Sequence, residues 1–183
     1  MKAAAIGLTG SLILASGSFG PAKAQSGTAL LVPGYDAARD LPGAREMPDP
    51  QTDYKVVFAD AQDAKSPGDI NPMLPTIAMY VNTLGKYGVP REHRHIVIMF
   101  HHRSADMDIV MNNEAYKERY HRDNPNIALI HALKEAGVDI RACGQGVLAR
   151  KIDPKQVNPD IQIDLWAATS LVNLQLKGYV RVG

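Results

Sequence analysis

Cysteine is almost absent from this 183-residue sequence, which contains Cys143 and no other. An intramolecular disulfide is therefore excluded, and a metal site built from paired thiols cannot form within one chain. A surplus of one charge is missing as well, because 20 lysines and arginines face 19 aspartates and glutamates. No run of lysine or arginine is longer than two, so no stretch is suited to following a nucleic acid or an anionic membrane.

Motifs for nucleotide and hydrolase chemistry are missing too. The sequence has no P-loop, no G-x-G-x-x-G motif and no G-x-S-x-G nucleophile elbow. We therefore expect no cofactor, and no motif favours a hydrolase. What is present is an ordinary globular composition, 45% hydrophobic and 21% charged, with a length typical of one domain.

The first 24 residues have the pattern of a secretory signal peptide. A lysine at position 2 precedes an uncharged stretch over residues 3–20, and residues 21–24 (PAKA) supply a small-x-small cleavage site. The alternative is a transmembrane anchor, but glycine, serine and threonine interrupt the apolar stretch, which is short for about 30 Å of hydrocarbon. We expect cleavage after Ala24 and a periplasmic protein with no membrane span after processing.

Prolines and glycines are concentrated in residues 25–53, which we predict to form an extended arm on the domain or on a neighbouring subunit. From residue 54, short apolar runs alternate with longer amphipathic stretches, as in an α/β domain with a largely parallel sheet. Strands are predicted at 54–59, 96–100, 138–142, 161–165 and 179–182, and helices at 73–87, 127–136, 145–151 and 167–177. Asn124 is predicted to cap the 127–136 helix, with Pro125 in its first position.

The expected fold class is therefore α/β. The five strands and the helices between them predict a three-layer α/β/α sandwich over residues 54–183, with a mostly parallel five-stranded sheet.

Chemically useful side chains follow two of the predicted strands. His101 and His102 come after the 96–100 strand, and Cys143, Gly144 and Gln145 come after the 138–142 strand. Ligands bind beyond the carboxyl ends of parallel strands, so we expect both groups at one crevice. A thiol at the start of a helical turn lies beside unpaired N–H groups, here those of Gly144 and Gln145, which stabilise a thiolate.

Two interpretations of Cys143 stay open on these grounds. Arg141, Arg150 and Lys151 add positive potential if their side chains turn inward, which favours a reactive thiolate. A lone cysteine at a strand end is more often a small buried hydrophobe. Export tilts the choice toward a reactive role, because a free thiol in an oxidising compartment is prone to oxidation and wrong pairing.

Five short motifs occur in a set order: EAYKER at 114–119, DNPN at 123–126, ALKEAGV at 132–138, ACGQ at 142–145 and LQLKGY at 174–179. Together they resemble the DsrE/DsrF-like family of small sulfur-relay proteins, and most closely its exported branch. The resemblance implies a three-layer fold, assembly into trimers or hexamers, and a persulfide on a cysteine after the third strand, where Cys143 stands. His101 matches a family histidine, and His102 stands where members often have glycine.

The resemblance and the residues together predict an exported sulfur carrier, a sulfurtransferase-like relay protein. Cys143 would take sulfane sulfur from a donor, hold it as a persulfide and pass it on. His101 would donate a hydrogen bond to the thiolate or carry a proton, unless a backbone group satisfies it. Gly144, Gln145 and His102 would bind the substrate.

The expected partners are further copies of the chain, in a homotrimer or homohexamer, and an exported sulfur donor or acceptor protein. The alternative function is a non-catalytic oligomeric binding module of the same fold, for a small molecule, a metal or a protein.

Two other features give weaker signals. His93 and His95 are expected in a solvated loop; with His101 and His102 they offer nitrogen ligands for zinc or copper. No carboxylate or thiol lies at a characteristic ligand spacing, so we predict no metal site. Trp166, near the end of the 161–165 strand, is expected at a pocket or at a subunit interface.

Overall fold

The structure is a computed structural model that describes residues 29–59, 64–101 and 105–182. The predicted signal peptide, its cleavage site after Ala24 and the side chain of His102 lie outside these residues. Within them, no helix combines the length and the apolar character that crossing a membrane requires.

Five strands form one sheet in the order β4-β3-β2-β1-β5. The strands are β1 (Tyr54–Phe58), β2 (Arg94–Phe100), β3 (Asp139–Cys143), β4 (Gln162–Asp164) and β5 (Val180–Val182). The α-helices of the described residues are α1 (Met73–Lys86), α2 (Asn113–Tyr120), α3 (Ile127–Glu135), α4 (Gly144–Ala149) and α5 (Ala167–Leu176). Every strand pairing is parallel, so the predicted α/β class and five-stranded sheet are confirmed.

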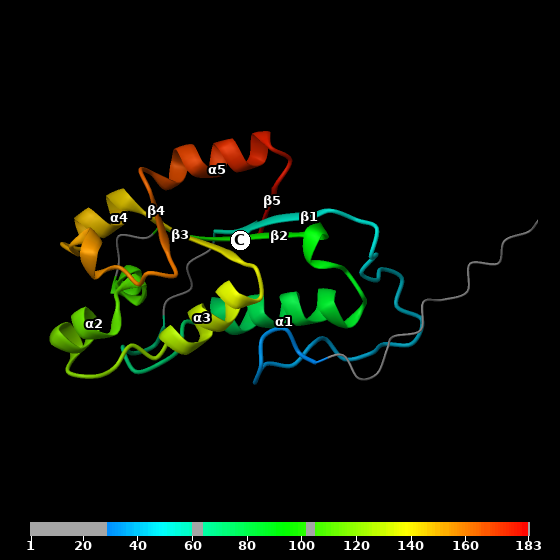
Figure 1. The fold of residues 1–183 in the computed structure, drawn as a ribbon, viewed down its shortest axis with the longest axis horizontal. Helices are drawn as coiled ribbons and strands as arrows, with labels where there is room; N and C mark the ends of the chain where they lie inside the picture. Colours follow the sequence, from blue (N-terminus) through cyan, green and yellow to red (C-terminus); the bar gives the residue numbers. More distant parts are fainter. Residues whose placement is uncertain (1–28, 60–63, 102–104, 183) are drawn as a thin grey trace, which may run out of the picture.

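Helices lie on both faces of the sheet, which makes three layers (Figure 1). α1 and α3 pack on one face, and α5 is the described helix that packs on the other. Alternate residues of β2 serve the two faces: Ile96 and Ile98 join the core under α1 and α3, whereas Val97 and Met99 pack with α5. Because α5 follows edge strand β4 and leads to edge strand β5, it crosses the width of the sheet.

The sequence pattern explains the central elements. α1 buries Ile77, Val81 and Leu84, which recur at helical spacing. The apolar run at 96–100 is buried on both faces, as expected of a strand inside a parallel sheet.

Two elements differ from the sequence-based expectation. β2 begins at Arg94, two residues before the predicted start, so His95 belongs to the strand. α2 was not predicted, because it has no apolar stripe and buries only Ala115 and Tyr116. A local signal does exist, since the side chain of Asn112 accepts the N–H of Ala115 at 2.9 Å and caps the helix.

The start of α3 also differs. Asn126, rather than Asn124, immediately precedes the helix, and Pro125 lies outside it. The buried side chain of Asn124 accepts the N–H of Asn126 at 3.0 Å and donates to the carbonyls of Ile109 and Met111 at 2.9 Å each. A buried amide needs such partners, so these tertiary contacts override the local capping preference.

The N-terminal arm lies against α1. Residues 29–53 contain no helix or strand, and Asn82 of α1 holds them by accepting the N–H of Val32 at 2.8 Å. Asn82 also donates to the carbonyls of Val32 at 2.9 Å and Tyr35 at 2.6 Å. The hydroxyl of Thr83 accepts the N–H of Ala38 at 2.8 Å. This part of the arm is therefore fastened to the domain of its own chain.

A buried carboxylate ties α2 to α4. Asp108 accepts hydrogen bonds from Arg150 at 2.9 and 2.8 Å and from the Tyr120 hydroxyl at 2.6 Å, and pairs with Arg119 at 3.0 Å. Burial by itself raises the pKa of Asp108, but these donors outweigh it and hold the pKa below its usual value. Arg150 ends α4, so the network fixes the helix that begins directly after Cys143.

We predict that Tyr120→Phe lowers the free energy of unfolding by about 1.5 kcal/mol at pH 7, because it removes a hydrogen bond to a charged group. Burial and the bond to Asp108 raise the pKa of Tyr120 from 10.0 to about 12. The stabilisation from the hydroxyl is complete below the unfolded-state pKa and is lost as the pH rises toward the folded-state value.

Urea unfolding from pH 7 to pH 11 checks this. The difference between the native protein and Tyr120→Phe should narrow above pH 10. A difference that stays constant across that range would contradict the role assigned to the hydroxyl.

Candidate functional site

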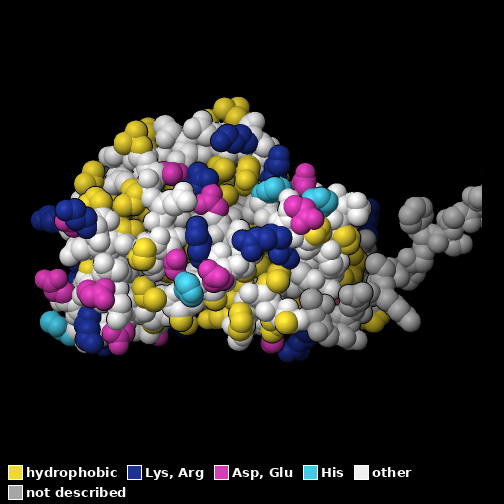
Figure 2. All heavy atoms as spheres, viewed as in Figure 1, with side chains coloured by type: hydrophobic (Ala, Val, Ile, Leu, Met, Phe, Trp, Pro, Cys, Tyr) yellow, Lys and Arg dark blue, Asp and Glu magenta, His cyan; other side chains and the backbone are white. Residues whose placement is uncertain are grey.

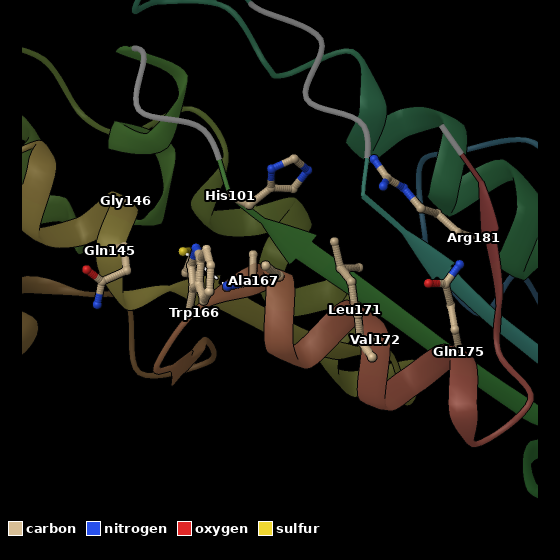
Figure 3. Close-up of a pocket in the computed structure, with 11 residues that line it drawn as sticks. His101, Gln145, Gly146, Trp166, Ala167, Leu171, Val172, Gln175 and Arg181 are labelled. Carbon is tan, nitrogen blue, oxygen red and sulfur yellow. Dashed lines mark hydrogen bonds between the residues drawn. The ribbon is translucent and has the colours of Figure 1, made fainter.

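The candidate site lies at the carboxyl ends of β2 and β3. These strands are neighbours, and Phe100 pairs with Ala142, so His101 and Cys143 lie at adjacent positions. Cys143 is the last residue of β3, whereas the sequence predicted that the strand ends at residue 142. The side chains of His101 and Cys143 line one pocket of about 390 Å³. α5 and the residue before it supply one wall, and Figure 3 shows this helix across the pocket from His101; the wall residues are Trp166, Ala167, Ala168, Leu171, Val172 and Gln175.

The sulfur of Cys143 accepts a hydrogen bond from the first residue of α5. The N–H of Ala167 lies 3.3 Å from Sγ, and Cys143 is only 3% exposed. The sequence predicted N–H donors from Gly144 and Gln145 instead. Cys143 does precede α4, but its side chain makes no capping hydrogen bond to that helix. The donor that favours negative charge on the sulfur therefore comes from α5.

Gly144 and Gln145 contact the segment between β4 and α5, which leads to the Ala167 N–H. A Cβ atom on Gly144 would lie 2.9 Å from the carbonyl oxygen of Asp164 and 3.2 Å from that of Leu165, so the chains approach too closely for a side chain. The side-chain amide of Gln145 donates to the carbonyl of Leu165 at 3.2 Å and lines the pocket. Both residues thus hold the connection between β4 and α5, which ends at Ala167.

His101 is bound to the end of β1. Its Nε2 donates to the carbonyl oxygen of Ala59. A carbonyl can only accept, so Nε2 carries a proton and, in the neutral ring, Nδ1 is the basic nitrogen. His101 thus has the backbone partner that the second interpretation expects, and its ring also lines the pocket with Cys143.

Positive potential from Arg141, Arg150 and Lys151 was expected only if their side chains turned toward Cys143, and they do not line the pocket. Arg141 binds Asp139 at 2.6 Å and Asp164 at 3.4 Å, and these bonds raise its pKa. Arg150 is bound to Asp108. Neither these arginines nor the exposed Lys151 is among the residues that line the pocket, because nearby carboxylates hold the two guanidinium groups elsewhere.

No sequence motif points to the side chains that α5 and β5 add to the site. Arg181 of β5 and Gln175 of α5 line the same pocket. The available signal was an arginine inside a short apolar strand, at 179–182 (YVRV), where a charge needs a reason. Trp166, which was expected at a pocket or interface, lines the pocket and is half-exposed.

His93 and His95 lie at the opposite end of β2 from His101. His93 ends a 3₁₀ turn and His95 lies in β2, so neither is in the solvated loop that was expected. Their Nε2 atoms are 3.9 and 3.8 Å from Asp53 Oδ1, and the carbonyl of Pro50 lies 2.8 Å from His93 Nδ1. In the described part of the chain, no group of three or more histidine, cysteine or acidic residues is arranged to hold a metal ion.

A family model described as the DsrE/DsrF-like family matches residues 54–182. A search of curated proteins finds none that matches. Among solved structures, the chain is similar to a protein of unknown function, MTH1491, from Methanobacterium thermoautotrophicum, with 17% identity and a TM-score of 0.46 over 71% of this chain and 100% of that one.

We predict that Gly144→Ala lowers the free energy of unfolding by about 1–3 kcal/mol, because backbone atoms must move to admit the methyl group. The same movement should change the rate at which iodoacetamide alkylates Cys143, since the displaced connection carries the Ala167 N–H. Urea unfolding and intact mass measure the two effects.

The matched control is Leu148→Ala, at an exposed position of the same helix. It should change stability by no more than about 0.5 kcal/mol. Equal behaviour of the two variants would show that the close approach at Gly144 is unimportant.

Proposed function

Because this chain belongs to the DsrE/DsrF-like family, we propose that it is a sulfur carrier that works through Cys143. Membership of this family points to a sulfur-relay type of function, and the matched residues 54–182 include the whole sheet, α5 and the pocket. The observation that carries the proposal is the position of Sγ, which lines a pocket of about 390 Å³ and accepts the N–H of Ala167.

The proposed reaction is a two-step exchange. The Cys143 thiolate attacks the outer sulfur of a sulfane donor; a new S–S bond forms, and the electron pair of the old S–S bond leaves with the donor as a thiolate that takes up a proton. An acceptor thiolate then attacks the outer sulfur and releases the Cys143 thiolate. Sulfur is transferred without net oxidation of the protein.

Neighbouring groups have distinct parts in this exchange. The Ala167 N–H and the positive end of the α5 dipole stabilise negative charge on Sγ. His101, oriented by the carbonyl of Ala59, is the proposed proton carrier of the site. Gly144 and Gln145 hold the segment that carries the Ala167 N–H, and they are not proposed to bind the sulfur themselves.

We further propose that the carrier works in the periplasm with an exported donor or acceptor protein. The support is the sequence of residues 1–24, with its uncharged stretch and small-x-small end.

Assembly into a homotrimer or homohexamer is also proposed. Large hydrophobic side chains are exposed on α5 and on the segment between β4 and α5, a set that we call the α5 patch: Leu165, Trp166, Val172 and Leu176. Figure 2 shows hydrophobic side chains along the α5 side of the molecule. Exposed apolar surface of this kind marks a protein–protein interface, and here a second copy would cover it.

We predict that the mature protein gains the mass of one or more sulfur atoms on exposure to polysulfide, and that Cys143→Ser does not. Intact mass spectrometry, with a reduced sample as control, makes the measurement. The added mass should disappear on treatment with a thiol reductant. If both proteins stay folded and unmodified, the carrier hypothesis fails for this donor and a binding role gains support.

We predict that Leu176→Glu shifts the native assembly toward the monomer, because a charge would be buried at the proposed interface. Leu176 is 81% exposed in the single chain. Gel filtration with light scattering should show three or six chains for the native protein. Met79→Glu, on the exposed side of α1, is the matched control and should leave the assembly intact. A monomeric native protein would overturn the proposal.

A further inference from the structure

The pocket around Cys143 has an unbalanced charge. Among its described lining residues, Arg181 is the one with a permanent charge, and none is acidic. The amides of Gln145 and Gln175 add neutral hydrogen-bond donors. A volume of about 390 Å³ falls in the range of small-molecule sites, about 300–1,000 Å³. The pocket is therefore suited to a small ligand that carries negative charge.

Arg181 differs from the arginines that serve the fold. Arg119, Arg141 and Arg150 each bind a carboxylate. Within residues 29–59, 64–101 and 105–182, no salt bridge involves Arg181. Its register partner Val57 packs on the α5 side of the sheet, and Figure 3 shows the guanidinium group reaching toward the pocket. Its charge is thus directed at the site.

The sheet sets the distance between Arg181 and Cys143. Three strand intervals separate β5 from β3, which is about 14 Å. The register runs from Arg181 through Val57 and Val97 to Asp139, four residues before Cys143, which adds about 13 Å along the strands. A ligand that meets both side chains must therefore be elongated, with its charge several bonds from its reactive sulfur.

We infer that the pocket selects persulfides of small acidic thiols, with Arg181 binding a carboxylate of the donor while the sulfane sulfur meets Cys143. This inference rests on the proposed function. In the transfer, the Cys143 thiolate forms a bond to the outer sulfur of R–S–SH, the S–S bond of the donor breaks, and R–S⁻ leaves with its electron pair and is protonated. Between the two ends, Leu171 and Val172 of α5 line the path of the donor.

The test compares two donors with the same reactive end. Glutathione persulfide carries carboxylates, and 2-mercaptoethanol persulfide is neutral. Stopped samples analysed by intact mass give a second-order rate constant for sulfur addition to Cys143 from each. The native protein should favour glutathione persulfide by about tenfold, the effect of one hydrogen bond to a charged group. Added salt should reduce the preference.

Variants assign the preference to Arg181. Arg181→Gln should bring the ratio of the two rate constants close to one, and Arg181→Lys should keep part of it, because the charge remains without the bidentate geometry. Lys177→Gln is the matched control; it removes the same charge from an exposed site that does not line the pocket, and it should keep the native ratio. A folding defect would slow both donors alike and leave the ratio unchanged.

The outcomes separate the two proposals. If Cys143 takes sulfur from neither donor, the proposed function fails. If it takes sulfur from both at equal rates, or if Arg181→Gln keeps the native ratio, the carrier stands and the selection of acidic donors is overturned. Loss of the preference in Lys177→Gln would also overturn it, because a general effect of net charge would then explain the result.

Discussion

The site and the proposed interface depend on one packing interaction, in which the single helix α5 covers one face of the sheet. Five strands at about 4.8 Å spacing make a surface about 19 Å wide, whereas a helix of ten residues is about 15 Å long and about 10 Å across. One helix cannot close such a face. The part left open toward the carboxyl ends of the strands is the pocket, and α5 itself carries the exposed α5 patch. Site and proposed interface thus depend on the same helix.

The same helix determines the chemistry available at the sulfur. The first residue of α5 lies beside the carboxyl end of β3, so its N–H donates to Sγ of Cys143. Later residues of α5 form one wall of the pocket. The sulfur is almost fully buried yet lines a pocket, which combines shelter from solvent with access along one direction. Arg141 could have supplied charge here, but Asp139 and Asp164 hold it. Polarity at the site therefore comes from the backbone N–H, from His101 and from Arg181.

Features with a local cause were predictable from the sequence. The apolar runs predict the five strands, and the order of the short motifs indicates the family. The positions of Cys143 and His101 at strand ends therefore follow from the sequence. α2 was missed because it buries few residues, and the role of Asn124 was missed because its partners are distant in sequence. The bond from Ala167 to Cys143 joins residues 24 apart. No local pattern encodes such a contact, because it depends on how α5 packs back on the sheet.

The presence of one sulfhydryl group in the chain has a kinetic consequence. Proteins with a second, resolving cysteine can discharge a modified thiol by forming an internal disulfide. Cys143 has no such neighbour in this sequence, so every return to the resting thiol needs an encounter with another molecule. The lifetime of a loaded state would then follow the concentration of that molecule and its entry past Trp166 and α5. In the proposed carrier, a persulfide on this buried sulfur would therefore persist until an acceptor thiol arrives.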